Sequence, residues 1–131
     1  MKINYALISR SLIAILFIVA GIQKLTGLKM TSGFIGQLLH VSSPVLATLA
    51  TLIVVFIEVV VAAAYAYGYR VCVTGGILAT FTVVATLLVH NNFPADLVMF
   101  LKNLAIIGGI ISTIITCECG NGKCPATKKH A

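Results

Sequence analysis

Residues 45–67 read VLATLATLIVVFIEVVVAAAYAY, an apolar stretch interrupted by one ionisable residue, Glu58. A membrane-spanning helix needs about 20 predominantly apolar residues, so this stretch is long enough to cross a bilayer. A carboxylate near the centre of such a helix costs on the order of 2.5–3.5 kcal/mol when it faces lipid. We therefore expect Glu58 to face protein or a polar cavity, and to have a cationic partner elsewhere in the chain.

The composition is that of a membrane protein. The chain of 131 residues is 60% hydrophobic and only 9% charged, whereas soluble domains carry about 25% charged residues. The formal net charge of +6 could suggest a nucleic-acid partner. However, the charges stand at the ends of apolar runs and in a short C-terminal tail rather than along one face. We therefore expect the chain to be surrounded by lipid and to have no nucleic-acid partner.

Four apolar runs predict an all-α membrane protein, an antiparallel bundle of four transmembrane helices over residues 5–25, 45–67, 71–89 and 95–116. The apolar part of the long connection from Thr26 to Ser43 is too short to cross the bilayer. This connection therefore predicts a short interfacial helix between the first two transmembrane helices. Residues 1–116 then form one transmembrane domain, and 117–131 a tail rich in cysteine and lysine. Basic residues concentrate on the side shared by both termini, which predicts a multi-pass protein of a prokaryotic inner membrane with both termini in the cytoplasm.

Depth in the bilayer limits the partners of Glu58. It stands nine residues before Tyr67, about 13 Å from that end of its run. Arg10 enters from the same side and is the first candidate, and Lys102, which enters from the other side, is the second. Lys102 begins a stripe of small residues that we expect to face the bundle, namely Ala105, Gly109, Ser112 and Thr116. The resulting ion pair either only fixes helix packing, or lines a pocket that binds a headgroup such as a quinone ring or relays a proton.

Four cysteines form the second candidate site. Cys117, Cys119 and Cys124 fall within eight residues, and Cys72 begins the third run. In the predicted topology all four lie at the cytoplasmic face, where stable structural disulfides are not expected. Thiols close to lysine residues could bind a soft metal or exchange disulfides, but the spacing matches no common zinc signature. A solvated tail with incidental thiols, a metal site and a thiol redox site all remain open.

Several short motifs together resemble the DoxX family of small prokaryotic membrane proteins. They are Arg10 followed by the GIQKL segment at 21–25, Glu58, His90, the FLKNL segment at 100–104, and Gly108-Gly109. The resemblance implies a four-helix membrane bundle and kinship with DoxD, a membrane subunit linked to thiosulfate:quinone oxidoreduction. It further implies that the polar positions of interest are Arg10, Lys24, Glu58, His90 and Lys102. Asn103, next to Lys102, is the sixth candidate pocket residue. The cysteine-rich tail is not part of the resemblance.

Three functions are compatible with these features. The first is a small membrane subunit that supports quinone- or thiol-linked electron transfer together with other membrane or cytoplasmic subunits. The sequence has no nucleotide motif and no expected haem ligation, so at most it is one subunit of an oxidoreductase. The second is a structural or assembly subunit without chemistry of its own. The third is a small proton-coupled exporter, which would need a homo-oligomer because four helices enclose too narrow a path.

Overall fold

A computed structural model describes residues 5–90 and 94–116, and the described chain is helical with short connections. Its elements are α1 (Tyr5–Thr26), α2 (Leu28–Leu38), α3 (Pro44–Phe56), η1 (Ile57–Val61), α4 (Ala62–Tyr67), α5 (Val71–Val89) and α6 (Leu97–Thr116). Here α3, η1 and α4 follow one another without a break and form one long helix. Four helices of the described chain are long and apolar enough to cross a membrane, which confirms the predicted fold class. The short helix expected between the first two spans is α2, and α6 begins two residues later than expected.

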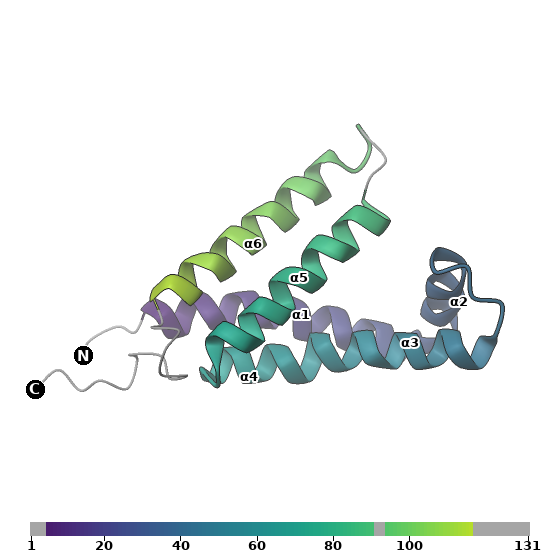
Figure 1. Cartoon of the computed structure of the whole chain (residues 1–131), viewed down its shortest axis with the longest axis horizontal. Helices are drawn as coiled ribbons and strands as arrows, with labels where there is room; N and C mark the ends of the chain where they lie inside the picture. Colours follow the sequence, from purple (N-terminus) through teal and green to yellow (C-terminus); the bar gives the residue numbers. More distant parts are fainter. Residues whose placement is uncertain (1–4, 91–93, 117–131) are drawn as a thin grey trace, which may run out of the picture.

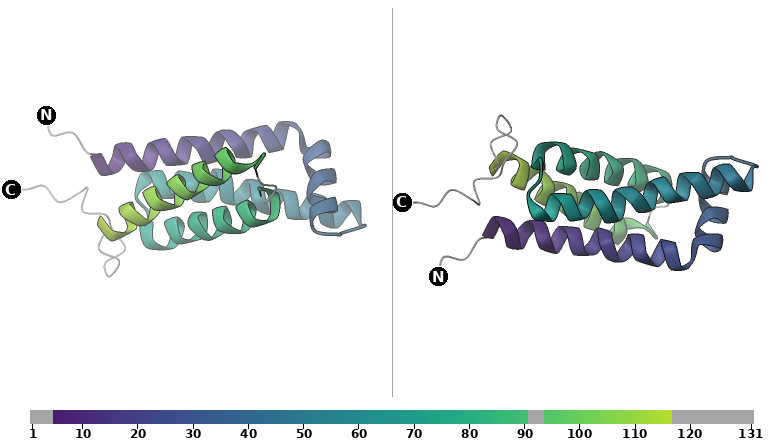
Figure 2. Two further views of the ribbon diagram at one scale, coloured as in Figure 1. Left: turned by 90° about the horizontal axis from the view of Figure 1, so that it is seen from above. Right: turned by 90° about the horizontal axis from the view of Figure 1, so that it is seen from below.

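The long helices run antiparallel, as Figures 1 and 2 show. The start of α1, the α4–α5 turn and the last turn of α6 lie at one end of the molecule, here called the turn end. The opposite end carries α2 and is called the α2 end. At the turn end, Gly68 adopts a left-handed conformation (φ 92°) and its N–H donates to the carbonyl of Ala64, 3.1 Å away. Such a glycine ends a helix at little conformational cost and lets α5 return directly beside α4.

The helix pair α5–α6 diverges from α1 and α3 toward the α2 end (Figure 1). It packs against α1, η1 and α4, near the turn end. The core cluster includes Phe17, Tyr65, Leu78 and Ile110, each almost fully buried. The hydroxyl of Tyr65 is hydrogen-bonded to that of Thr113, which joins α4 to α6. The bundle is therefore tightly closed at the turn end and more open at the α2 end.

The rotation of α6 differs from the sequence expectation. Its fully buried residues are Ile110 and Thr113, whereas Lys102, Ala105, Ser112 and Thr116 are exposed. Two side-chain hydrogen bonds fix this rotation: Thr113 to Tyr65, and the Asn103 amide Nδ2 to Thr86 Oγ1 at 2.9 Å. The predicted stripe is therefore wrong for Lys102, Ala105, Ser112 and Thr116, because hydrogen-bonding side chains at other positions set the face. Gly109 does face the bundle: it is half-buried, and a Cβ there would lie 3.2 Å from Ile13 Cδ1.

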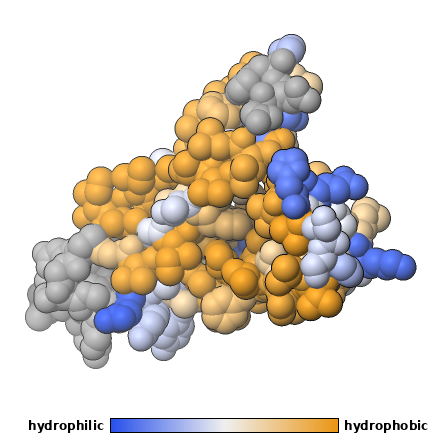
Figure 3. Space-filling model, turned by 45° about the vertical axis from the view of Figure 1, so that its right-hand side comes forward, coloured by the Kyte–Doolittle hydropathy of each residue, from blue (hydrophilic) through white to orange (hydrophobic). Residues whose placement is uncertain are grey.

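The outer surface is apolar around the bundle. Many leucine, isoleucine and valine side chains of all four long helices are exposed, including Leu12, Ile53, Leu87 and Val98. The face seen in Figure 3 is hydrophobic over most of its area, and its hydrophilic groups gather toward the ends. A soluble protein of this size would bury such residues, so the surface is one suited to lipid.

Candidate functional site

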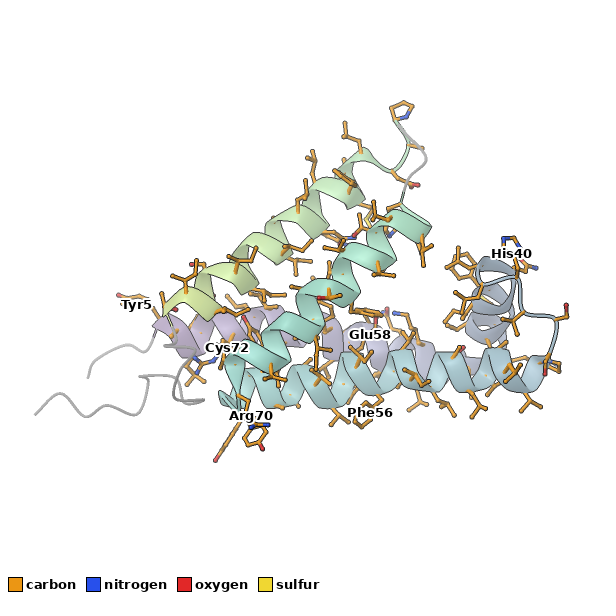
Figure 4. The ribbon with its side chains drawn as sticks, in the orientation of Figure 1. Tyr5, His40, Phe56, Glu58, Arg70 and Cys72 are labelled. Carbon is orange, nitrogen blue, oxygen red and sulfur yellow. The ribbon has the colours of Figure 1, made fainter. Side chains whose placement is uncertain are left out.

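Glu58 pairs with Lys24 in the middle of the bundle. The Lys24 Nζ donates to Glu58 Oε1 at 2.7 Å, and the carboxylate side chain is 5% exposed whereas the lysine side chain is 31% exposed. Figure 4 shows Glu58 midway between the end that carries Tyr5, Arg70 and Cys72 and the end that carries His40. The expected interior position of Glu58 is confirmed. The expected pairing with Arg10 or Lys102 is wrong.

The register between α1 and its neighbours explains why Lys24 is the partner. A Cβ added at Gly68 would lie 3.3 Å from an Nη atom of Arg10, so Arg10 is level with the α4–α5 turn. Glu58 stands ten residues before Gly68, about 15 Å further along the helix at 1.5 Å per residue. This distance places the carboxylate beyond the reach of Arg10. Arg10 is instead buried at the turn end, with 1% of its surface exposed.

Gly21 brings α1 against the helix segment that carries Glu58. A Cβ at this position would lie 2.6 Å from Val59 Cγ2 and 3.1 Å from Glu58 Cβ. Only glycine therefore permits this approach, and Lys24 follows three residues later on the same side of α1. The GIQKL segment thus contains both the contact point and the cation, a signal that was present in the sequence.

The backbone around Glu58 is a π-helical turn. Residues Ile57–Val61 depart from α-helical hydrogen bonding within an otherwise continuous helix. Single π turns inside α-helices occur frequently at functional sites, because the wider turn re-aims the side chains on one face. The apolar pattern of residues 45–67 contains no signal for such a turn, and the sequence predicted an uninterrupted helix.

A cavity of about 490 Å³ adjoins the ion pair. It lies where α5 and α6 diverge from α1 and α3, and α2 borders it at the α2 end. Most of its lining is apolar and includes Phe17, Phe34, Phe81 and Leu88. Its polar lining residues are Lys24, Thr31, Glu58, Thr82, His90, Lys102 and Asn103. The cavity is amphipathic, with apolar walls and a few polar groups that converge on it, as in many ligand sites.

Five of the six predicted polar positions line this one cavity: Lys24, Glu58, His90, Lys102 and Asn103. Arg10 does not. Lys102 lies exposed on α6 and its Nζ contacts Met99 Sδ at 3.6 Å, so it borders the cavity without reaching Glu58. A second groove, of about 750 Å³, lies between α2 and the start of α3, but none of these positions lines it. The cavity at Glu58 is therefore the candidate site.

One carboxylate oxygen of Glu58 has an unmet hydrogen bond. Its Oε2 is buried and finds no donor among the residues that the structure describes, while Oε1 takes the lysine proton. An ionised carboxylate oxygen that is buried without a donor costs considerable free energy. Glu58 lines the cavity, but protein atoms cover Oε2 itself, so the polar feature that the cavity adjoins is the ion pair with Lys24.

The cysteine prediction is tested at one position only. Cys72, in the first turn of α5, is disulfide-bonded, so the expectation of no structural disulfide is wrong for this residue. That expectation depended on the compartment and not on the fold. Cys117, Cys119 and Cys124 lie outside the described residues. Within the described ranges, no three histidine, cysteine, aspartate or glutamate residues form a group that could hold a metal ion.

The fold and the site define a small integral membrane protein with four long helices, a buried ion pair and an amphipathic cavity. The chain belongs to the DoxX family, whose model matches residues 5–91. It is also 33% identical over 112 residues to the inner membrane protein YqjF of Escherichia coli strain K12, an alignment that covers 84% of this chain and 82% of the relative. No solved structure matches it.

Proposed function

We propose that this chain is a quinone-binding membrane subunit that supports electron transfer by a partner protein. The observation that carries the proposal is the Lys24–Glu58 ion pair, whose two residues line an amphipathic cavity within the bundle. A quinone is an apolar ring with polar oxygens and a hydrocarbon tail, and this distribution of polarity matches the cavity. The kinship with DoxD that the sequence resemblance implies is consistent with a quinone-linked role.

The lining residues supply the interactions that a quinone ring needs. The ammonium of Lys24 and the side chain of His90 are potential donors to ring carbonyls, and both border the cavity. Phe17, Phe81 and other apolar side chains provide contacts for the ring and the tail. The chain would bind and orient the quinone, and the partner would deliver or remove the electrons.

Filling the cavity should abolish quinone binding. Ala85 of α5 lines the cavity, and Ala85→Phe would place an aromatic ring in it. With the wild-type protein in detergent, decylubiquinone at about 100 times its Kd should stabilise the fold by about 2.7 kcal/mol, measured as a rise in Tm. We expect this rise to disappear in Ala85→Phe.

The matched control is Val83→Phe on the same helix, at a position that is 41% exposed and does not line the cavity. This control should keep the full rise in Tm. Equal rises in both variants, or no rise in the wild-type protein, would contradict the proposal.

A second function, the assembly subunit, is supported by the loose packing of α6. Only Ile110 and Thr113 of its 20 residues are buried. Much of this helix is therefore accessible to a partner helix within the membrane. Purification in mild detergent, followed by protein mass spectrometry, tests this role. Stoichiometric copurifying subunits without bound quinone would favour assembly over quinone binding.

We further propose that the chain lies in the inner membrane with both termini in the cytoplasm, as the distribution of basic residues predicts. The location agrees with that of its Escherichia coli relative, which is an inner membrane protein. A fluorescent protein fused after residue 131 should fluoresce, and alkaline phosphatase fused there should be inactive. The reverse pattern would overturn this orientation. It would also place the disulfide-bonded Cys72 on the oxidising side, where such bonds persist.

A further inference from the structure

We propose that the cavity binds an amphipathic anion, and that the ammonium group of Lys102 holds the charge of this ligand. The inference rests on the proposed function, because it concerns the ligand of the same cavity and adds a negative charge to it. It follows from the charged side chains that line the cavity. Lys24 and Lys102 are cationic, whereas Glu58 is the one acid among the described lining residues.

Lys102 has no acidic partner in the part of the chain that the structure describes. The acid of the cavity, Glu58, is paired with Lys24 at 2.7 Å. The Lys102 Nζ instead donates to Met99 Sδ at 3.6 Å, and a thioether sulfur is only a weak acceptor. Because the Lys24–Glu58 pair is neutral overall, the described lining carries a net positive charge, and this charge is on Lys102.

The charge of Lys102 lies inside the membrane span and toward the α2 end of the cavity. Lys102 follows Leu97, the first residue of α6, by five residues, or about 7.5 Å along the helix axis at 1.5 Å per residue. Since the last turn of α6 lies at the turn end, this start of the helix lies at the α2 end. An ionisable residue within a span is costly unless it meets an anion, another polar group or water, and such residues commonly mark ligand pathways.

The groups around Lys102 suit an oxyanion attached to an apolar body. An oxyanion would form a charge-assisted hydrogen bond with the ammonium group. Asn103 offers a second donor, because its amide Nδ2 carries two hydrogens and one of them goes to Thr86 Oγ1 at 2.9 Å. Phe81 and Leu88 of the lining would contact the apolar body. A quinone with an ionised ring hydroxyl group and a long-chain carboxylate both have this chemistry.

The test compares two forms of one ligand, a naphthoquinone that carries a ring hydroxyl group and an undecyl chain, and the methyl ether of that hydroxyl group. The first is an anion at neutral pH, and the ether is neutral. Titration calorimetry in detergent measures the Kd of each for the wild-type protein and for Lys102→Gln. We expect Lys102→Gln to weaken binding of the anion about tenfold, the ratio that one hydrogen bond to a charged group supplies, and to leave binding of the ether unchanged.

Each ligand is compared between variants, so that its partition into micelles cancels. Two matched variants complete the design. Lys29→Gln makes the same chemical change at an exposed lysine that does not line the cavity, and both Kd values should stay at the wild-type level. Lys102→Arg keeps the positive charge and should keep the tighter binding of the anion.

A parallel titration with dodecanoate and dodecanol distinguishes the two sources of the anion. Dodecanoate binding that is lost in Lys102→Gln, with no binding of either naphthoquinone, would support the anion site, assign its charge to a long-chain carboxylate and overturn the quinone-binding function. Binding of both naphthoquinones with equal Kd values in the wild-type protein and Lys102→Gln would overturn the anion site and leave the quinone-binding function standing. Binding of none of the four compounds would overturn both.

Discussion

Replacing Lys24 with methionine should lower the free energy of unfolding by about 3 kcal/mol. The substitution keeps most of the side-chain volume but leaves the Glu58 carboxylate, which is 4% exposed, without its cation. Removing one partner of a buried ion pair costs about 3–5 kcal/mol, and the lower value applies here because the Lys24 side chain is 31% exposed. Equilibrium unfolding in mixed micelles measures the change.

Two further variants distinguish the effect on stability of losing the Lys24–Glu58 ion pair from the effect of losing any lysine. Lys29→Met removes an exposed lysine at the start of α2 and should change the stability by less than about 0.5 kcal/mol. The double variant Lys24→Met, Glu58→Met removes both charges and should recover most of the lost stability, because apolar pairs often replace buried ion pairs without cost. If Lys24→Met and Lys29→Met proved equally mild, the ion pair would not hold the bundle together.

Gly21→Ala should also destabilise the protein, by about 1–3 kcal/mol. The new methyl group would lie 2.6 Å from Val59 Cγ2, and valine has little freedom to rotate away. The helices would have to separate, which would move Glu58 away from Lys24 and weaken ligand binding as well. The measurements are the same unfolding experiment and the decylubiquinone-dependent rise in Tm.

The control for this change is Gly76→Ala in α5. A Cβ there meets nothing within 4 Å, so only the higher helix propensity of alanine acts. That difference should leave the protein unchanged or stabilise it by up to about 1 kcal/mol. A stable Gly21→Ala variant with unaltered ligand binding would show that the close approach of α1 to η1 does not position the carboxylate.

Composition and apolar run length were sufficient to predict the fold class, because a bilayer admits few architectures for such a sequence. The buried position of Glu58 followed from the cost of a lipid-facing charge. The buried residues of α1, which are Arg10, Ala14, Phe17 and Gly21, recur at helical spacing and lie on one face. These features depend on the local sequence and on the lipid surroundings, and both can be inferred from the sequence.

The partner of Glu58 could not be predicted in the same way, because it depends on how far one helix slides along another. Gly21 and Gly68 set that register through close contacts, and the choice between Arg10 and Lys24 depends on it. The rotation of α6 likewise depends on hydrogen bonds between distant residues, Asn103 with Thr86 and Tyr65 with Thr113. The π turn at Glu58 has no signature in a uniformly apolar helix.

The most direct test of the account is to identify the small molecules that copurify with the protein. Wild-type protein and the Ala85→Phe variant would be isolated in mild detergent without oxygen, and bound molecules would be extracted and quantified by mass spectrometry. The account predicts a quinone or quinol in near-stoichiometric amount with the wild-type protein, and little with Ala85→Phe. Equal trace amounts of quinone in both preparations would contradict a ligand site at Glu58.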